Sequence, residues 1–515
     1  MNSNQSVKKS LEDEICASSR FWTVNDIVSA LNFFSIPYDA QISGFSIDSR
    51  TIQKGECFVA IKGENFDGHD FIEESFKKGA SLCIVENSDL PFLKKYNHLV
   101  VDDTQKALSD LALYTRNNTE ATIIGISGSV GKTTVRTWVS EILSLVGETV
   151  SSKKNYNGRI GLPLSMLSLK KDSQFGVFEI GIDRQGTMQH FAKICQPNVA
   201  VITAIAPSHI EFFNSIDSLA AEKADLLSGL CSGGAAVINH EIFKKFPIFQ
   251  QKIKEWYSEN GVNNYLDIPT VGVTSEATAY IVSANSDFQK GQTKIYAKLA
   301  GVDVCYTIHA IGNSKILNSL IALVTAITSL YNENFGVIMR EKWNNISDSL
   351  LKGMENLRVL PGRGRLFNVC IKNCQEVTII DDSYNANPTS MKAGIEDLCS
   401  YISAKRRIAV IGGMLELGNI SEKEHFYIFN LLNNTKVDKV YAVGDLTKSG
   451  FETLSSSKKG AWTKSPDEMS KILKDEIKSK DIILIKGSFS MKLWKIVKKF
   501  ENSCISQPIL KEKIA

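Results

Sequence analysis

The residues Gly125-Ile-Ser-Gly-Ser-Val-Gly-Lys-Thr-Thr134 decide the fold of this chain. They follow the apolar run 121–125 and precede a segment of helical composition, Val135 to Val146. This order is typical of a phosphate-binding loop, in which backbone N–H groups and a helix N-terminus converge on anionic oxygens. Five residues separate Gly125 from Gly131, one more than in the strict loop pattern, so the tight core begins at Gly128. The stretch predicts a nucleoside triphosphate site, and a glycine-rich turn that only joins strand to helix is the alternative.

Within this loop, each position has an expected contact. Lys132 should reach the terminal phosphates, and the Thr133 hydroxyl should bind Mg²⁺. The remaining expected nucleotide contacts are Gly128, Ser129, Val130, Gly131 and Thr134. The loop alone does not identify the group that receives the phosphate.

The bulk composition describes a multidomain globular protein. With 515 residues the chain is too long for one core, and about three domains are expected. Its 43% hydrophobic and 22% charged residues are ordinary for a soluble protein. The net charge of +3 is spread along the chain rather than gathered into a basic stripe. We therefore expect no nucleic-acid partner.

Several features predict a cytoplasmic location. We expect no apolar run of the roughly 18 to 20 residues that a membrane span needs. The polar residues 1–20 lack the charged-then-apolar build of a signal peptide. The ten cysteines show no paired spacing, since Cys370 and Cys374 form a lone CxxxC. Reduced thiols are the expected state.

After the polar extension at 1–20, the apolar segments divide the chain into three α/β regions with boundaries at 21–118, 119–360 and 361–515. The first has short apolar runs at 45–47, 57–61, 81–85 and 98–101, with helices expected at 23–31, 71–78 and 104–116, and predicts a small mixed α/β domain. The second has continuous apolar runs at 122–126, 175–178, 199–205 and 235–238. Such runs are typical of a parallel sheet covered on both faces.

Two segments of the second region differ from this rhythm. Residues 268–309 alternate as antiparallel strands do, and are expected at the sheet edge, while 313–331 reads as a long helix. The third region repeats the α/β rhythm with runs at 377–380, 407–411, 440–443 and 482–485. Its fold is expected to be Rossmann-like, but it lacks a GxGxxG stretch, so a dinucleotide site is not expected.

Chemically useful residues follow the strands next to the phosphate loop. The run 175–178 ends at Glu179, and the run 199–205 leads to His209. Ligands of open α/β sheets bind beyond the carboxyl ends of the strands, so both side chains are expected near the loop. A carboxylate and an imidazole there suit Mg²⁺, which takes few protein ligands. A hydrogen-bonded loop histidine and a strand-end carboxylate are the alternatives.

A competing signal is Thr435-Lys-Val-Asp438, which resembles the guanine-reading element of GTPases. It precedes its strand at 440–443 instead of following one, and it lies in another domain from the phosphate loop. We interpret it as a helix-to-strand turn.

The central motifs resemble those of the Mur peptide ligases. The resemblance is carried by the loop 128–134 together with Asn155-Tyr-Asn157 and Ile160-Gly-Leu-Pro163. It implies that Glu179 and His209 bind Mg²⁺ with Thr133. It also implies that Lys223, fourteen residues after the histidine, is carbamylated and completes the metal site.

The outer regions resemble the branch of this family that adds D-alanyl-D-alanine. In the third region the resemblance is carried by Asp381-Asp-Ser-Tyr-Asn-Ala-Asn-Pro388, Ile411–Gly418 and Ile485–Met491, and in the first by Asp48-Ser-Arg50, 57–63 and Asp67–Phe71. It covers about residues 40 to 500 and implies a uridine-nucleotide module at 21–118, an ATP-binding domain at 119–360 and a ligase domain at 361–515. The implied substrate contacts are Ser49, Arg50, His69, Asn155, Asn157, Asn385 and Asn387, and Asp382 is an implied nucleotide contact.

Some positions depart from the family pattern. Gly158 replaces the second of two asparagines, and Arg159 stands where an acidic residue is common. Ser314-Lys315 replaces a His-Asn pair, which leaves Asn318 as the adenine-contacting asparagine. Either Arg363 or Arg365 matches the family's nucleotide-contacting arginine, and we favour Arg363.

The resemblance implies an ATP-dependent ligase with Mg²⁺ as cofactor, expected to act as a monomer. ATP would phosphorylate the terminal carboxylate of UDP-N-acetylmuramoyl-tripeptide, and the amine of D-alanyl-D-alanine would attack the acyl phosphate. The product would be the pentapeptide precursor of peptidoglycan. The alternatives are another ligase of this fold, such as the diaminopimelate- or lysine-adding ligase or a folylpolyglutamate synthase, and a non-catalytic nucleotide-binding protein.

Overall fold

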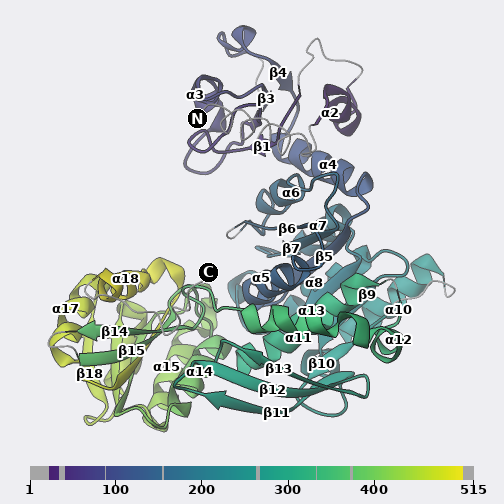
Figure 1. Ribbon diagram of the computed structural model, residues 1–515. Coiled ribbons are helices and arrows are strands. Elements are labelled where there is room, and N and C mark those ends of the chain that lie inside the picture. The colour runs from purple at the N-terminus through teal and green to yellow at the C-terminus, as the bar shows by residue number, and fades with distance from the viewer. Residues whose placement is uncertain are drawn as a thin grey trace, which may run out of the picture.

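Three sheets follow one another along the chain in the computed structural model, which describes residues 22–33, 41–86, 89–153, 156–261, 267–331, 333–371 and 375–502. Figure 1 shows the N-terminal part at the top, the central part below it, and the C-terminal part beside the central one at the lower left. The predicted α/β class with three domains is confirmed.

The N-terminal sheet has four strands, all in parallel register. Its order is β1 (Phe45–Ser46), β2 (Cys57–Val59), β3 (Leu82–Val85) and β4 (His98–Val100). The helices around it are α2 (Val24–Leu31), α3 (Ile72–Lys77) and α4 (Thr104–Asn117). Helix α2 begins where Thr23 and Asp26 cap each other's backbone N–H groups. At the start of α4, the side chain of Asp103 accepts hydrogen bonds from the backbone N–H groups of Gln105 and Lys106. Helix α4 then leads into the central sheet.

The central sheet has nine strands in the order β13-β12-β11-β10-β9-β8-β5-β7-β6. Strands β5 to β11 pair in parallel, whereas β11, β12 and β13 pair antiparallel at the edge. The bounds are β5 (Thr122–Ser127), β6 (Thr149–Ser151), β7 (Phe175–Glu179), β8 (Val199–Ile202), β9 (Ala235–Asn239), β10 (Thr270–Gly272), β11 (Ala279–Asp287), β12 (Gln292–Leu299) and β13 (Val302–Ile308).

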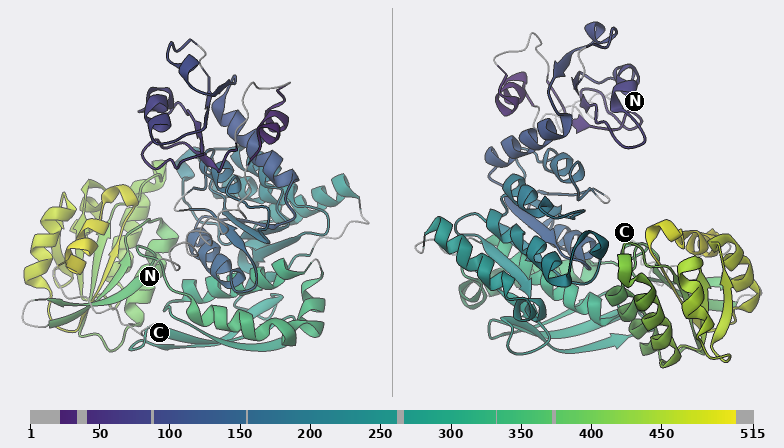
Figure 2. Two further views of the ribbon diagram at one scale, coloured as in Figure 1. Left: turned by 45° about the horizontal axis from the view of Figure 1, so that its top comes forward. Right: turned by 180° about the vertical axis from the view of Figure 1, so that it is seen from behind.

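Helices cover both faces of this sheet, as Figure 2 shows. Ile124 and Ile126 of β5 pack in the core of one face, with α5 (Lys132–Leu143), α11 (Asn313–Leu330), α12 (Phe335–Glu341) and α13 (Trp343–Asn356). Ile123 packs in the core of the other face, with α6 (Gly161–Met166), α7 (Thr187–Cys195), α8 (Ile216–Ala224), α9 (His240–Lys245) and α10 (Ile248–Asn260). Because successive side chains of a strand point to opposite faces, a strand buried on both faces must be apolar throughout.

Helix α11 corrects one expectation from the sequence. Its 18 residues are long and apolar enough to cross a membrane, although no such run was expected. Within the structure, 72% of the helix is buried, and Leu320, Leu323 and Ile327 lie fully inside the core of the central sheet. A helix that is apolar all round is required there because it packs between a sheet and other helices.

The C-terminal sheet has six strands in the order β14-β15-β19-β16-β17-β18, and only the edge strand β14 is antiparallel. The bounds are β14 (Arg365–Ile371), β15 (Gln375–Asp382), β16 (Arg406–Gly412), β17 (Lys439–Val443), β18 (Lys459–Thr463) and β19 (Asp481–Lys486). One face carries α14 (Pro388–Ser400), α15 (Ser421–Asn433) and α16 (Lys448–Glu452), and the other carries α17 (Pro466–Glu476) and α18 (Trp494–Asn502).

Most expected elements are present, and the differences lie at sheet edges. Strands β6, β14 and β18 were not expected, because they are short or carry polar residues that an edge strand tolerates. Strands β11, β12 and β13 confirm the expected antiparallel edge over most of 268–309, whereas β10 pairs in parallel with both β9 and β11. Thr435–Asp438 does lie between α15 and β17, as a helix-to-strand turn.

Candidate active site

The phosphate loop has the backbone that its glycines predict. Gly128 has φ +143°, and an ideal Cβ placed there would lie 2.1 Å from Thr203 Oγ1. Gly131 has φ +93° and directly precedes α5. Both positions therefore require glycine. Thr203, just beyond β8, donates its hydroxyl to the carbonyl of Val130 at 2.6 Å, which fixes the loop over the N-terminus of the helix.

Two cations and a hydroxyl lie at this loop. Lys132 Nζ donates to the carbonyl oxygen of Gly128 at 2.8 Å. Burial lowers the pKa of Lys132, and nearby Arg363 lowers it further, against the opposing carboxylate of Glu179. Arg363 comes from the C-terminal domain, and its Nη2 donates to Thr133 Oγ1 at 3.0 Å. The C-terminal domain thus reaches the loop of the central domain.

The two candidate arginines have different surroundings. The guanidinium of Arg363 stacks over the ring of Tyr384 at 3.9 Å and faces the loop. Arg365 instead forms ion pairs with Asp381 and Glu501 inside the C-terminal domain. Of the two, only Arg363 lines the cavity described below.

Glu179 lies beside the loop because β5 pairs with both β7 and β8. Its side chain is 3% exposed, and its Oε1 accepts a hydrogen bond from Asn157 Nδ2 at 2.7 Å. Its Oε2 is buried and accepts no hydrogen bond among the described residues. A buried carboxylate oxygen without a donor is costly unless a cation or a ligand meets it.

Two nitrogen-bearing side chains, His209 and Lys223, line the same cavity as Glu179. His209 follows β8, and its Nδ1 lies 2.5 Å from Glu416 Oε2 of the C-terminal domain. Burial, Lys132 and Lys223 lower the pKa of His209 to about 4, so the imidazole is neutral and can offer a lone pair. Lys223 on α8 is 1% exposed, and burial together with Lys132 holds its pKa well below the usual range.

The donor set fits Mg²⁺ in part. Glu179 supplies a buried oxygen without a hydrogen-bond donor, and His209 supplies a neutral imidazole. Among the described ranges, no group of three or more His, Cys, Asp or Glu side chains is placed to hold a metal. Mg²⁺ commonly takes one or two protein carboxylates and completes its shell with phosphate oxygens and water. The residues present agree with that mode of binding.

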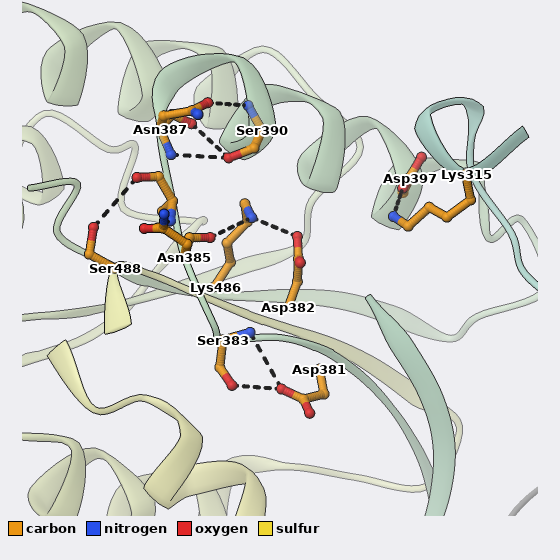
Figure 3. Close-up of polar contacts among 11 residues, drawn as sticks. Lys315, Asp381, Asp382, Ser383, Asn385, Asn387, Ser390, Asp397, Lys486 and Ser488 are labelled. Atoms are coloured by element: carbon orange, nitrogen blue, oxygen red, sulfur yellow. Dashed lines mark hydrogen bonds and ion pairs between the residues drawn. The ribbon is translucent and has the colours of Figure 1, made fainter. Parts of the chain in front are cut away.

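The C-terminal domain contributes a second group of residues to the site (Figure 3). Strands β15 and β19 are parallel neighbours that end at Asp382 and Lys486. Lys486 is 2% exposed, and its Nζ contacts Asp382 Oδ2 at 2.6 Å and donates to the carbonyl of Asn385 at 3.0 Å. Asn387 caps α14, since its Oδ1 accepts from Ser390 N at 2.8 Å. The stretch Asp381–Pro388 therefore forms a hydrogen-bonded turn between the end of β15 and the start of α14.

An ion pair joins the central and C-terminal domains beside these residues. Lys315, at the start of α11, donates to Asp397 Oδ2 of α14 at 2.7 Å, and each side chain is 11% exposed (Figure 3). Burial lowers the pKa of Lys315, but Asp397 and Asp382 outweigh it and hold this pKa above its usual value. The lysine that departs from the family pattern thus bridges the central and C-terminal domains.

One cavity of about 350 Å³ collects most of the predicted site residues. The predicted residues that line it are Ser129, Val130, Gly131, Lys132, Thr133, Thr134, Asn157, Glu179, His209, Lys223, Asn318, Arg363, Asp382, Asn385 and Asn387. Gly128 belongs to the same loop, and Asn155 lies outside the described residues.

The predicted uridine-module residues lie in the N-terminal domain and do not line this cavity. Ser49 Oγ donates to Glu74 Oε2 at 3.2 Å. Arg50 is exposed and pairs with Asp48 at 2.7 Å, and this hydrogen bond lowers the pKa of Asp48 to about 2. His69 is buried, with Nδ1 at 2.6 Å from Asp67 and Nε2 accepting from the backbone N–H of Glu86. Both nitrogens of His69 are therefore engaged within its own domain.

The motifs do not predict a role for Lys486, Tyr384 or Glu416. All three lie within stretches that carried the family resemblance. Their contacts depend on which strands neighbour each other and on how the domains meet. A sequence motif can indicate such a residue, but it does not indicate which residue it contacts.

Comparisons with known proteins place the chain in a family. Three family models match in order: "Mur ligase family, catalytic domain" at 41–116, "Mur ligase middle domain" at 126–326, and "Mur ligase, glutamate ligase domain" at 364–489. A UDP-N-acetylmuramoyl-tripeptide--D-alanyl-D-alanine ligase of Buchnera aphidicola is 31% identical over 476 residues, which are 92% of this chain and 95% of that protein. One of the same name from Rickettsia prowazekii is 30% identical, over 87% and 93% of the two chains.

Solved structures agree with these matches. The MurF ligase of Thermotoga maritima in complex with ADP is 26% identical with a TM-score of 0.72, covering 89% of this chain and 97% of that one. MurF from Acinetobacter baumannii, at 24% identity, has the same fold with a TM-score of 0.78 over 94% and 100% of the chains. Matched in all three domains and aligned with relatives over nearly their whole length, the chain belongs to the Mur ligase family.

Proposed function

We propose that this chain joins UDP-N-acetylmuramoyl-tripeptide to D-alanyl-D-alanine, with conversion of ATP to ADP and phosphate. The product is the pentapeptide precursor of peptidoglycan. Relatives of 31% and 30% identity carry the name of this activity. The observation that carries the proposal is the single cavity in which the phosphate loop faces the turn Asp382–Asn387 of the C-terminal domain. Such a cavity brings a nucleotide and an acceptor together.

The reaction needs the carboxylate to be activated before the amine can attack. A carboxylate oxygen of the tripeptide attacks the terminal phosphorus of ATP, and the bond from that phosphorus to the bridging oxygen breaks to release ADP. The amine of D-alanyl-D-alanine then attacks the acyl carbon and loses a proton, and phosphate leaves as the amide forms. Lys132, Arg363 and the loop N–H groups are placed to stabilise the charge on the moving phosphoryl group. No covalent enzyme nucleophile is required.

Mg²⁺ would be held by Thr133, Glu179, His209 and Lys223, and would neutralise phosphate charge. As a free amine, Lys223 is a poor ligand beside Lys132. Its lowered pKa favours the neutral amine, and a neutral amine can add CO₂ and release a proton to give a carbamate. This addition replaces a potential cation with an anionic oxygen ligand. We therefore include carbamylated Lys223 in the proposal.

The remaining roles follow the division of the chain. We assign 21–118 to the UDP-muramoyl peptide, through Ser49, Arg50 and His69, with 1–20 as an extension. We assign 119–360 to ATP, with Asn318 near the adenine and Asn155 and Asn157 toward the muramoyl peptide. We assign 361–515 to the ligase step, with Asp382 at the nucleotide and Asn385 and Asn387 at the dipeptide. Three separate sheets support this division.

The compartment and assembly are also proposed. We propose a cytoplasmic monomer, since the cysteines among the described residues are unpaired thiols. Its partners would be the two substrates, with no nucleic acid.

One assay tests the function. ADP release is measured with the tripeptide nucleotide, with D-alanyl-D-alanine, with both, and with the substrate pairs of other ligases of this fold. Release that needs both the tripeptide nucleotide and D-alanyl-D-alanine supports the proposal. Release with diaminopimelate or lysine on a dipeptide nucleotide, or with folate and glutamate, assigns another ligase. Nucleotide binding without release under any condition identifies a non-catalytic protein.

A further inference from the structure

A side chain of the C-terminal domain contacts a proposed metal ligand of the central domain. His209 directly precedes η4 (Ile210–Phe212), and Glu416 lies in the loop between β16 and η7 (Gly418–Ile420). Glu416 Oε2 lies 2.5 Å from His209 Nδ1. The backbones also meet, since Glu211 N donates to the carbonyl of Glu416 at 3.4 Å. The two loops therefore form one contact across the domain boundary.

Both members of the pair hold an uncommon backbone conformation. His209 has φ +56° and Glu416 has φ +61°, in the left-handed region that favours glycine. Only seven non-glycine residues in the described ranges have positive φ, and two of them meet here. Such conformations cost free energy and persist where the surroundings determine them, most often at functional sites. The pairing of two such residues indicates a selected geometry rather than a chance surface contact.

The loop that carries Glu416 is fixed by buried polar groups. Met414 N donates to His425 Nε2 at 2.9 Å, and Leu415 N donates to Ser488 Oγ at 2.9 Å. His425 is 2% exposed and Ser488 is 4% exposed. The carboxylate of Glu416 is therefore presented from a rigid base, and its place relative to His209 is set by how the two domains dock.

The contact between Glu416 and His209 itself contributes little to stability. The side chains of His209 and Glu416 are 34% and 48% exposed, so water screens their attraction. An imidazole that binds a metal ion through one nitrogen carries its N–H on the other, and the hydrogen-bond partner of that N–H fixes which nitrogen holds it. A carboxylate at Nδ1 selects the tautomer whose Nε2 keeps a free lone pair.

We propose that Glu416 is a positioning residue for His209: its carboxylate accepts the Nδ1–H of the imidazole and leaves Nε2 available to the cavity. This inference rests on the proposed role of His209 in holding Mg²⁺. A carboxylate behind a metal-binding histidine fixes the ring and raises its basicity. Because Glu416 belongs to the C-terminal domain, the metal site is complete only when that domain is docked on the central one.

The test measures metal affinity rather than turnover. Mn²⁺ replaces Mg²⁺, and its binding to the full-length protein with a non-hydrolysable ATP analogue is followed by electron paramagnetic resonance. Glu416→Ala is expected to weaken Mn²⁺ binding by roughly 10- to 100-fold, the usual effect of removing a partner behind a metal ligand. Glu416→Gln keeps an acceptor for Nδ1–H and should lose less. Glu422→Gln removes an exposed carboxylate close in sequence and should bind as the parent does.

Two further variants separate the possible failures. His209→Ala should weaken Mn²⁺ binding, and adding Glu416→Ala to it should cause no further loss, because Glu416 acts through the imidazole. Parental affinity in Glu416→Ala, beside weak binding in His209→Ala, overturns the inference and leaves the proposed metal role intact. Parental affinity in His209→Ala overturns both. Thermal unfolding of each variant confirms that it is folded.

Discussion

At the residue scale, the site is dominated by buried basic side chains. Lys132, Lys223 and Arg363 share one cavity with the carboxylate of Glu179. Burial lowers the pKa of both lysines, and the charge of Arg363 lowers that of Lys132 further, as the charge of Lys132 does for Lys223. A cavity lined by these basic side chains favours binding of a polyphosphate, because the anion offsets the repulsion between their positive charges.

Lys132→Ala should therefore abolish most turnover. Lys132 lies at the phosphate loop, and removing one preorganised charge from a reaction centre costs about 10² to 10³-fold in kcat. The measurement is ADP release at saturating substrates. Lys170→Ala is the control, since Lys170 is a half-exposed lysine paired with Glu148 at 3.1 Å. Turnover near the parental level in Lys132→Ala would remove the proposed role.

Lys223→Ala should be inactive and partly restored by short carboxylic acids. The variant loses the carbamate oxygens, and a small carboxylate can occupy the space that the side chain leaves. Activity of the parent should also fall in CO₂-depleted buffer and return when bicarbonate is added. An unaffected Lys223→Ala, or a parent indifferent to CO₂, would show that no carbamate is needed.

At the element scale, the loop between β16 and α15 depends on one neutral histidine. Burial lowers the pKa of His425, whose Nδ1–H donates to the carbonyl of Ser421 at 2.7 Å while Nε2 accepts from Met414 N. Protonation of Nε2 would destroy the second hydrogen bond. The folded state therefore resists a proton that the unfolded chain binds near pH 6.5.

The sign of the pH dependence follows from this difference. As the pH falls below about 6.5, the unfolded chain takes up the proton first, so the free energy of unfolding decreases. His425→Gln should show a smaller loss between pH 7 and pH 5 than the parent, because the amide does not titrate. Urea midpoints at both pH values measure the effect. Equal losses in the two proteins would contradict it.

The elements around the site differ in how well the sequence predicts them. The phosphate loop, the strands around it and the strand-end residue Glu179 follow from local patterns, because glycine spacing and apolar runs are local properties. The edge strands β6, β14 and β18 are short or polar and gave no such pattern. The contacts of Lys315 with Asp397 and of His209 with Glu416 cross a domain boundary. No local pattern encodes a distance between domains.

At the scale of the whole molecule, three polar side-chain contacts among the described residues join the central and C-terminal domains around the cavity. They are Arg363 to Thr133, Lys315 to Asp397, and Glu416 to His209. Each contact includes a residue that would touch substrate or metal, or a residue that lies beside such a residue. In the proposed mechanism, docking of the C-terminal domain would complete the site and would also shield an acyl phosphate from water.

Asp397→Asn should loosen this docked arrangement. The variant leaves Lys315 as a buried charge without its carboxylate, and breaking such a pair costs about 3–5 kcal/mol unless the domains separate. We expect a larger radius of gyration in small-angle X-ray scattering. We also expect the rate of ADP release to rise less steeply with substrate concentration. Asp303→Asn is the control, because Asp303 is exposed and pairs with Lys298 within one hairpin. An unchanged scattering profile in Asp397→Asn would show that the ion pair does not hold the domains together.

The central claim is that the terminal phosphoryl group of ATP passes to a carboxylate before the amide forms. The direct measurement uses UDP-N-acetylmuramoyl-tripeptide with isotopically labelled oxygen in its terminal carboxylate, together with ATP and D-alanyl-D-alanine. Each phosphate released is expected to carry one labelled oxygen, because the carboxylate oxygen leaves with phosphorus. Amide formation with unlabelled phosphate would contradict it.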